Sequence, residues 1–388
     1  MRRYVLVALA LTVLGAGPGE AQRRERGRLP RKWLLAGVGA VIGEAAALLY
    51  THTSPGFNAQ CSSNTCVSIL SAAVGFGAGF LIGSEVDQLY NLRYRHAPPL
   101  TLRGQALPLS IIPNDISWRR GSLVAAGEQG VEVIATGPRM ERGEVRARGL
   151  RGVASALPDP LANRLFVATS TGLFGFDLSG PRVAGGLLAG GEVSALDVRG
   201  DRAAIVTDGA VRLAQLANDS LSALSAPRGF QSRATDVVWD PDRPVVWVLT
   251  ETALIALAVT DSGVADSLGA MAIPGTGRRL VLRGAWAAVA AGDGGAVTAD
   301  ISDPRAPRLA AQWNGARFVY DVAMSSGAVY VAAGPEGLYV LSLAPDGGTS
   351  AIGLTRGLGF VSALDSDGEH IILLDRAGGA LRRIPIAN

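Results

Sequence analysis

The stretch from Asp321 to Leu343 reads DVAM-SSG-AVYVAA-GPEG-LYVLSL. Three apolar, β-branched or aromatic runs are separated here by two clusters of Ser, Gly, Pro and Glu. Short runs bounded in this way are typical of β-strands joined by tight turns. A weaker fourth strand is predicted near Ala351–Leu354. The stretch therefore predicts one four-stranded antiparallel unit.

The same unit recurs seven times toward the C-terminus. The first positions of the seven copies are Asp115, Ser155, Ser194, Asp236, Arg279, Asp321 and Ser362. Their spacings are 40, 39, 42, 43, 42 and 41 residues. A period of about 40–45 residues of strand-forming sequence is typical of propeller blades. Residues 105–388 are therefore predicted to form a seven-bladed β-propeller of four-stranded blades, in a mainly β protein.

The repeat also predicts how the ring closes. The seventh copy ends after its third run, at Leu381–Ile384, and so lacks an outer strand. A strand-like stretch, Leu107–Ile112, precedes the first copy, and its Pro108 suits an edge strand because proline cannot donate to a central ladder. We expect this N-terminal stretch to supply the missing strand of blade seven.

Parts of the repeat resemble the LVIVD-repeat propellers. The segment Asp300–Pro307, DISDPRAP, is similar to the strand-end signature of that family, and Phe176–Pro181 is a degraded version. Gly337–Val340 fits the segment before the signature. The resemblance implies a surface or envelope propeller and transfers no active site. A WD40 interpretation is weaker, because the single Trp239-Asp240 pair falls at the first turn and no Gly-His accompanies it.

Charge is unevenly distributed along the chain. The formal net charge is +3, of which residues 1–21 contribute +1 and residues 22–32 contribute +5, leaving −3 for residues 33–388. Since the repeat region has no basic excess to attract phosphates, nucleic-acid binding is not expected.

Residues 1–21 have the features of a secretory signal peptide. Arg2 and Arg3 precede an apolar run, Tyr4–Leu14, and Gly19-Glu20-Ala21 offers a small-x-small cleavage site. An uncleaved anchor is the alternative. The basic segment 22–32 follows.

Residues 33–96 are predicted to form a glycine-rich helical hairpin, followed by a linker at 97–104. Its two apolar segments are Trp33–Tyr50 and Val67–Gly83. Glycines spaced four apart let two helices approach closely, here Gly39, Gly43, Gly75, Gly79 and Gly83. The hairpin is expected to associate with a membrane or to pair in a homo-oligomer.

Cys61 and Cys66 are the only cysteines, and they lie between the two apolar segments. In an exported protein two nearby cysteines most often form a disulfide, whereas a metal site would need further ligands. A loop in the reducing cytoplasm would not favour this bond. The whole mature chain is therefore expected in the periplasm, outer membrane or cell surface of a bacterium.

The sequence offers no recognisable catalytic constellation. It has three histidines, and His-Glu-x-x-His, Gly-x-Ser-x-Gly and P-loop motifs are all absent. We therefore expect a non-enzymatic scaffold for a protein or ligand partner, without a cofactor or metal. The alternative is a propeller hydrolase or lyase acting on a cell-wall or extracellular polymer.

The seven first-position residues are expected to ring one mouth of the central channel. They could form a polar portal for a ligand or cation, or their Asp and Ser side chains could bond to nearby backbone N–H groups. Convergence of Asp115, Asp236 and Asp321 on one point would favour an enzyme or metal site.

Asp365–Glu369 is interpreted as a turn rather than a calcium loop. Phe318, Tyr320 and Phe360 are expected near the rims, where they could contact a partner or pack in the core.

Overall fold

The computed structural model describes residues 105–386, except residues 120, 137–139, 142, 144, 147–148, 160–162, 178–184, 218–219, 262 and 367. All of them belong to the second of two units, residues 97–388. The predicted signal peptide, basic segment, hairpin, linker and Cys61–Cys66 pair lie outside the described residues, as do the five hairpin glycines. None of the described residues belongs to a helix that is long and apolar enough to cross a membrane.

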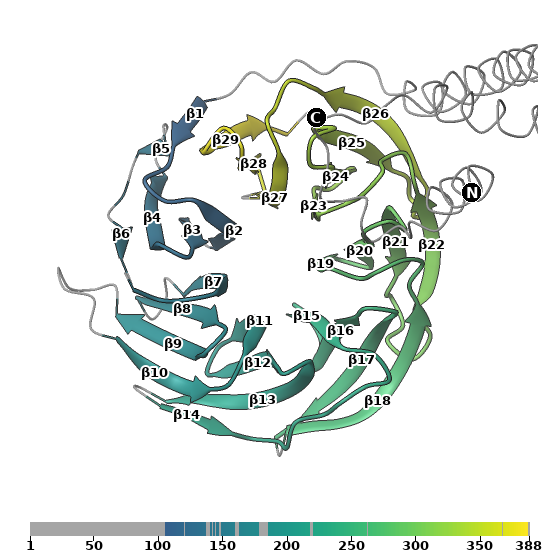
Figure 1. Cartoon of the computed structure of the whole chain (residues 1–388). Helices are drawn as coiled ribbons and strands as arrows, with labels where there is room; N and C mark the ends of the chain where they lie inside the picture. Colours follow the sequence, from purple (N-terminus) through teal and green to yellow (C-terminus); the bar gives the residue numbers. More distant parts are fainter. Residues whose placement is uncertain are drawn as a thin grey trace, which may run out of the picture. The chain divides into compact units, whose positions relative to one another are not determined.

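Seven antiparallel sheets surround a central channel, as Figure 1 shows. Blade one contains β2 (Pro113–Arg119), β3 (Ser122–Gly127), β4 (Gly130–Thr136) and two short outer strands, β5 (Met140–Glu141) and β6 (Val145–Arg146). Blade two contains β7 (Val153–Asp159), β8 (Arg164–Thr169), β9 (Gly172–Asp177) and β10 (Gly185–Gly190). Blade three contains β11 (Val193–Arg199), β12 (Arg202–Thr207), β13 (Ala210–Ala217) and β14 (Ser220–Ala223).

The remaining blades follow the same order from the channel outward. Blade four contains β15 (Ala234–Trp239), β16 (Val245–Thr250), β17 (Ala253–Thr260) and β18 (Gly263–Ala272). Blade five contains β19 (Arg279–Arg283), β20 (Trp286–Ala290), β21 (Ala296–Asp300) and β22 (Arg308–Trp313). Blade six contains β23 (Asp321–Met324), β24 (Ala328–Ala332), β25 (Leu338–Leu343) and β26 (Thr349–Thr355). Blade seven contains β27 (Val361–Ser366), β28 (His370–Asp375), β29 (Ala380–Pro385) and β1 (Gln105–Pro108).

The prediction of seven four-stranded blades is confirmed, and blade six follows the predicted strands closely. The predicted closure is also confirmed, because β1 pairs antiparallel with β29, with Leu107 opposite Leu381. The strand is Gln105–Pro108 rather than Leu107–Ile112, and Pro108 lies in an edge strand as expected. Beyond it, Glu132 Oε2 accepts the N–H of Ser110 at 2.7 Å.

The core is divided among the spaces between neighbouring blades. Between blades four and five, for example, Trp247 and Leu249 pack with Leu280 and Val289, all with 0–2 % exposure. Burying one such side chain contributes about 1.5–3 kcal/mol. The apolar residues of one blade are thus covered only when the next blade is in place, so the ring is stabilised by its closure.

The alternation of strand directions defines two faces. Each innermost strand begins on one face, which we call the upper face. The turns between second and third strands, and the connections from each outer strand to the next blade, lie there too. The opposite face, here the lower face, carries the other two turns of each blade.

Candidate functional site at the upper mouth of the channel

The innermost strands place one residue of each blade at the same level of the channel wall. Strand register identifies these residues as Asp115, Ser155, Ala195, Asp236, Arg279, Asp321 and Ala363. Each directly precedes a buried core residue. Five of the seven predicted ring positions are thus at one level. Ser194 and Ser362 precede it by one residue, because they are the extra residues of β-bulges in β11 and β27.

Two of the ring aspartates join neighbouring blades. Asp236 Oδ1 accepts the N–H of Val237 at 2.8 Å, and its Oδ2 accepts that of Leu280 in blade five at 2.8 Å. Asp321 is bonded in the same way, to Val322 at 2.7 Å and to Leu364 in blade seven at 2.8 Å. These contacts match the interpretation in which the side chains bond to backbone N–H groups. They do not match convergence on a single point.

Two further aspartates make the same contacts two residues deeper in the channel. Asp197 Oδ2 accepts the N–H of Trp239 at 2.8 Å, and Asp365 Oδ2 accepts that of Trp118 at 2.6 Å. Blades three and seven, which carry Asp197 and Asp365, have alanine at the ring level. The interpretation of Asp365 as a turn residue is therefore wrong, because it lies in β27 and contacts blade one. The sequence signal that could have revealed both residues is an Asp two positions beyond a ring-level Ala.

The Arg279 side chain of blade five lies between two of these aspartates, Asp236 of blade four and Asp321 of blade six. Its Nε lies 4.0 Å from Asp236 Oδ2 and 3.8 Å from Asp321 Oδ1. Burial tends to lower the pKa of Arg279, but the charges of Asp115, Asp236, Asp321 and Asp365 outweigh it and raise that pKa. Arg279 is therefore the cation common to a ring of carboxylates drawn from four blades.

Burial shifts the carboxyl groups of Asp236, Asp321 and Asp365 toward their neutral forms. It raises the pKa of Asp321 to about 7, against the opposing effects of Arg279 and the Leu364 N–H. It raises the pKa of Asp236 and of Asp365 to about 6, with the Asp115 charge adding to the rise in both. Carboxyl groups of this kind titrate close to neutral pH, so the charge of the channel mouth depends on pH.

Asp115 is bonded differently from the other ring aspartates. It is 8 % exposed, and its Oδ2 has no hydrogen-bond partner among the described residues. The Oγ atoms of Ser194 and Ser362 are also buried without a partner there. Among residues 105–386, apart from the gaps, no three His, Cys, Asp or Glu side chains are grouped to hold a metal ion.

An aromatic row lies on the upper face of blades five to seven. The ring centroids of Phe318 and Tyr320 are 4.7 Å apart, and those of Tyr320 and Phe360 are 4.9 Å apart. The guanidinium of Arg278 lies 5.4 Å from the centroid of Phe318. All three rings are half-buried, so each packs on the protein and also presents an edge or face to solvent. The rings are thus partly packed in the core, and their contact with a partner stays a prediction.

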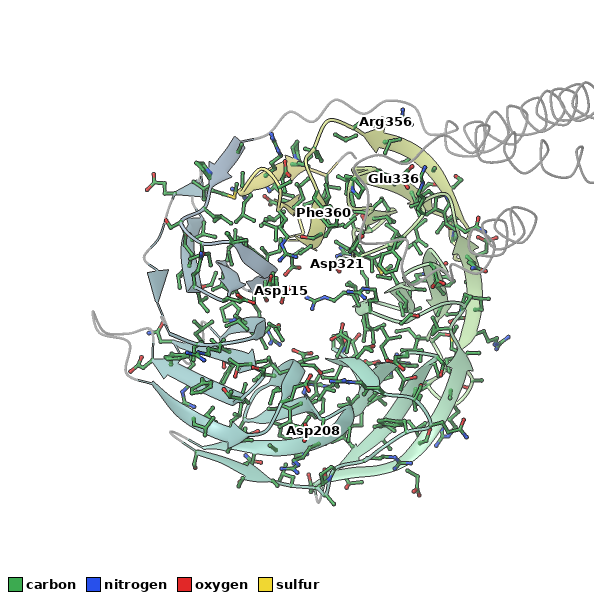
Figure 2. The ribbon with its side chains drawn as sticks, in the orientation of Figure 1. Asp115, Asp208, Asp321, Glu336, Arg356 and Phe360 are labelled. Carbon is green, nitrogen blue, oxygen red and sulfur yellow. The ribbon has the colours of Figure 1, made fainter. Side chains whose placement is uncertain are left out.

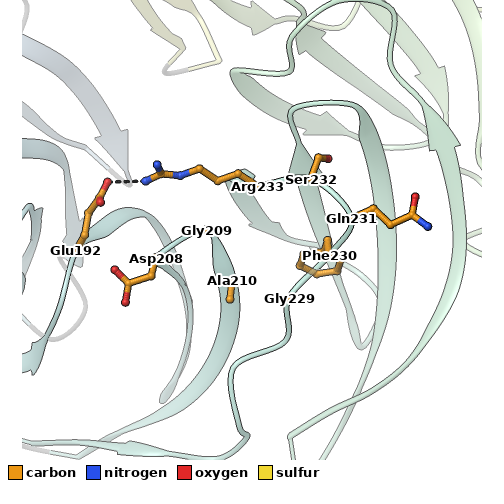
Figure 3. Close-up of a pocket in the computed structure, with 9 residues that line it drawn as sticks. All are labelled: Glu192, Asp208, Gly209, Ala210, Gly229, Phe230, Gln231, Ser232 and Arg233. Carbon is orange, nitrogen blue, oxygen red and sulfur yellow. Dashed lines mark hydrogen bonds and ion pairs between the residues drawn. The ribbon is translucent and has the colours of Figure 1, made fainter.

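A shallow pocket of about 490 Å³ lies on the upper face of blades three and four (Figure 3). Its polar wall includes Glu192, Asp208 and Arg233, and the Glu192–Arg233 ion pair measures 2.6 Å. Asp208 adopts φ 51° and is followed by Gly209 at φ 76°. Two positive φ values in an Asp-Gly pair are typical of a two-residue hairpin turn, so turn geometry accounts for this conformation.

Similarity to known proteins is confined to the fold. No family model matches the sequence, and no curated protein matches it. The Cps50 (Swd1) β-propeller domain of Myceliophteria thermophila superposes with a TM-score of 0.58 at 14 % identity, covering 74 % of this chain and 100 % of that one. The WD40 β-propeller domain of Doa1 superposes with a TM-score of 0.55 at 15 % identity, covering 74 % and 98 %. A protein from Lactobacillus plantarum has a TM-score of 0.55 at 13 % identity, covering 63 % and 84 %. At these identities the comparisons show that the chain is a β-propeller and nothing finer.

Proposed function

We propose that this protein is a non-enzymatic interaction scaffold whose upper face binds a partner. The aromatic row of Phe318, Tyr320 and Phe360, capped by Arg278, carries this proposal. Aromatic and arginine side chains are enriched at the energetic centres of protein interfaces. The row is built from two connections, between blades five and six and between blades six and seven, so a partner lying across it would contact neighbouring blades.

The hydrogen bonds that the ring carboxylates make within the propeller favour a scaffold over an enzyme. In a hydrolase or lyase acting on a cell-wall or extracellular polymer, acid–base carboxylates must be able to reach the substrate. Asp236 and Asp321 instead use both oxygens to bind backbone N–H groups of two blades. The similar folds of the Swd1 and Doa1 domains are compatible with a scaffold, on the strength of fold alone.

We further propose an envelope location, as the signal-like residues 1–21 and the LVIVD resemblance suggest. The glycine-rich residues 33–96 would hold the propeller at a membrane or in a homo-oligomer. A disulfide between Cys61 and Cys66 follows from this location. Alkylation of intact cells, followed by reduction and mass spectrometry, tests it: cysteines that label before reduction, from the cytoplasmic side, would contradict the envelope location.

Site-specific photo-crosslinking tests the binding face. A photoreactive residue is placed at exposed Arg356 on the upper face and, in a matched control, at exposed Asp346 on the lower face. We expect a discrete cross-linked partner from the upper position only, reduced when Phe360→Ala is added. Equal cross-linking from both positions, or none from either, would contradict the proposed face.

A further inference from the structure

We propose that the upper mouth of the channel binds one ammonium or guanidinium group, with Asp115 as the anchoring carboxylate. The ligand is either a free organic amine or the Lys or Arg side chain of a partner. Only the second source depends on the proposed scaffold function.

The first observation is an imbalance of charge. Arg279 Nε lies 4.0 Å from Asp236 Oδ2 and 3.8 Å from Asp321 Oδ1, and the charges of Asp115 and Asp365 also act on Arg279. With every group ionised, four negative charges face one positive charge, an excess of three. Arg279, already counted in this balance, pairs with Asp236 and Asp321, so Asp115 has no ion-pair partner within 4.0 Å among the described residues. A second cation at the mouth would therefore be attracted.

The second observation is the unpaired oxygen of Asp115. In Asp236 and Asp321 the Oδ2 atom accepts an N–H of the next blade, from Leu280 and Leu364. The corresponding residue beyond Asp115 is Ala156, and no hydrogen bond joins the two in the described structure. The Asp115 side chain lies at the channel edge (Figure 2), 8 % exposed, with Oδ2 lacking a protein donor among the described residues. A buried carboxylate oxygen gains most from a charged N–H donor.

The donor arrangement favours an organic cation over a metal ion. Calcium needs six to eight oxygen ligands, whereas an ammonium or guanidinium group can bind through one carboxylate and a few neutral acceptors. Among the described residues no side-chain group suited to a metal is present. Strand β27 packs against β2, and its Ser362 has a buried Oγ without a described partner, so a hydroxyl acceptor lies in the blade adjoining Asp115.

Calorimetric titration of the full chain tests the site at low ionic strength and pH 8. The probes are methylguanidinium, spermidine and a short peptide with a single Arg, together with the same peptide carrying Ala. We expect saturable binding of at least one cationic probe and none of the Ala peptide. Asp115→Asn should weaken binding at least tenfold. The matched control, Asp208→Asn, removes an exposed charge from the same face and should change affinity less than twofold.

Arg279→Gln provides a test that does not depend on losing binding. Removing the resident guanidinium leaves the carboxylates unopposed, so the affinity for methylguanidinium should rise several-fold. Thermal melting of each variant identifies any that fail to fold, and the conclusion then depends on the other. Absence of binding for every cationic probe would overturn the proposal, as would equal affinity in wild type and Asp115→Asn. Weaker binding in a folded Arg279→Gln would overturn it as well.

The probes also separate the two sources of the ligand. Saturation by methylguanidinium or spermidine alone indicates a free amine, whereas saturation only by the Arg peptide indicates a partner side chain. If no probe binds but Arg356 still cross-links a partner, the cation site is wrong and the scaffold stands. If the probes bind but no partner cross-links, the cation site stands and the scaffold is wrong.

Discussion

Asp321 Oδ2 accepts the main-chain N–H of Leu364 at 2.8 Å, which joins a side chain of blade six to the backbone of blade seven. Its Oδ1 accepts the N–H of Val322 in its own strand at 2.7 Å. The aspartate thus fixes the spacing of two innermost strands that share no ladder hydrogen bonds. Similar contacts from Asp197, Asp236 and Asp365 join blades three to four, four to five, and seven to one.

Asp321→Ala should lower the free energy of unfolding by about 2 kcal/mol, because two buried N–H groups lose their acceptor. Urea denaturation followed by tryptophan fluorescence measures the change. Asp346→Ala is the control, since Asp346 is exposed and bonds only within its own turn, to Gly348. A loss for Asp321→Ala no larger than for the control would contradict an inter-blade role.

Stability should depend on pH through the same carboxylate. The folded-state pKa of Asp321 is raised from 3.8 to about 7, so between these values the folded protein retains a proton that the unfolded chain has released. Its contribution to stability is therefore fully present at low pH and is lost as pH rises through about 7. For one such group the slope is about −1.4 kcal/mol per pH unit.

Asp321→Asn does not titrate and should remove this part of the slope. Denaturation of wild type and variant at pH 4.5, 5.5, 6.5 and 7.5 gives the difference directly. We expect the stability difference between the two proteins to change in favour of the variant as pH rises. A difference that stays constant across this range would mean that Asp321 keeps an ordinary pKa in the folded protein.

The repeat could be recognised from sequence because turn chemistry and strand composition are local properties. Blade six illustrates this, since its Ser-Ser-Gly and Gly-Pro-Glu-Gly turns delimit strands that the structure reproduces at Asp321–Met324 and Leu338–Leu343. Closure by β1 was also predictable, because the seventh repeat has only three strands of its own and the strand before the first repeat belongs to no other blade.

The composition of the channel wall was harder to predict. The register shifts by one residue directly before the ring level in β2, β7, β11, β15 and β27. In β11 and β27 the extra residue is a serine and the ring-level residue is an alanine, so choosing a polar residue in every repeat gave Ser194 and Ser362 instead of their alanine neighbours. The link between Asp365 and Trp118 spans 247 residues and depends on closure of the ring. No local pattern contains such a contact, and Asp365 stands in a Ser-, Asp- and Gly-rich stretch that is typical of a turn.

Gly334→Ala should destabilise the propeller and disturb the aromatic row. Gly334 has φ 58°, and a Cβ at this position would lie 2.6 Å from a ring carbon of Tyr320 and 3.2 Å from Phe360. The left-handed conformation alone costs a non-glycine residue about 1–2 kcal/mol. We expect a lower melting temperature and a changed near-ultraviolet circular dichroism spectrum. The control is Gly327→Ala, which has open space around the added methyl group and should be close to neutral.

The propeller should fold without the region that precedes it, provided that β1 is retained. Deleting residues 33–90 should leave the melting temperature of the propeller unchanged, and Gly79→Leu should affect only membrane association or oligomerisation. Removing residues 1–108, by contrast, takes away β1 and exposes the edge of β29. Leu107→Ala gives a milder test. Because Leu107 is 8 % exposed and packs in the core between blades one and seven, its truncation should cost about 2–5 kcal/mol.

Ile112→Ala is the matched control for Leu107→Ala, because Ile112 lies a few residues further along and is 60 % exposed. Differential scanning calorimetry of the two deletions and the two substitutions distinguishes the loss of ring closure by β1 from the loss of residues 33–90. If deletion of residues 33–90 lowers the melting temperature as much as removal of β1, that region belongs to the propeller's folding unit. The proposed role of residues 33–96 as a tether would then fail, whereas the β1–β29 closure would stand.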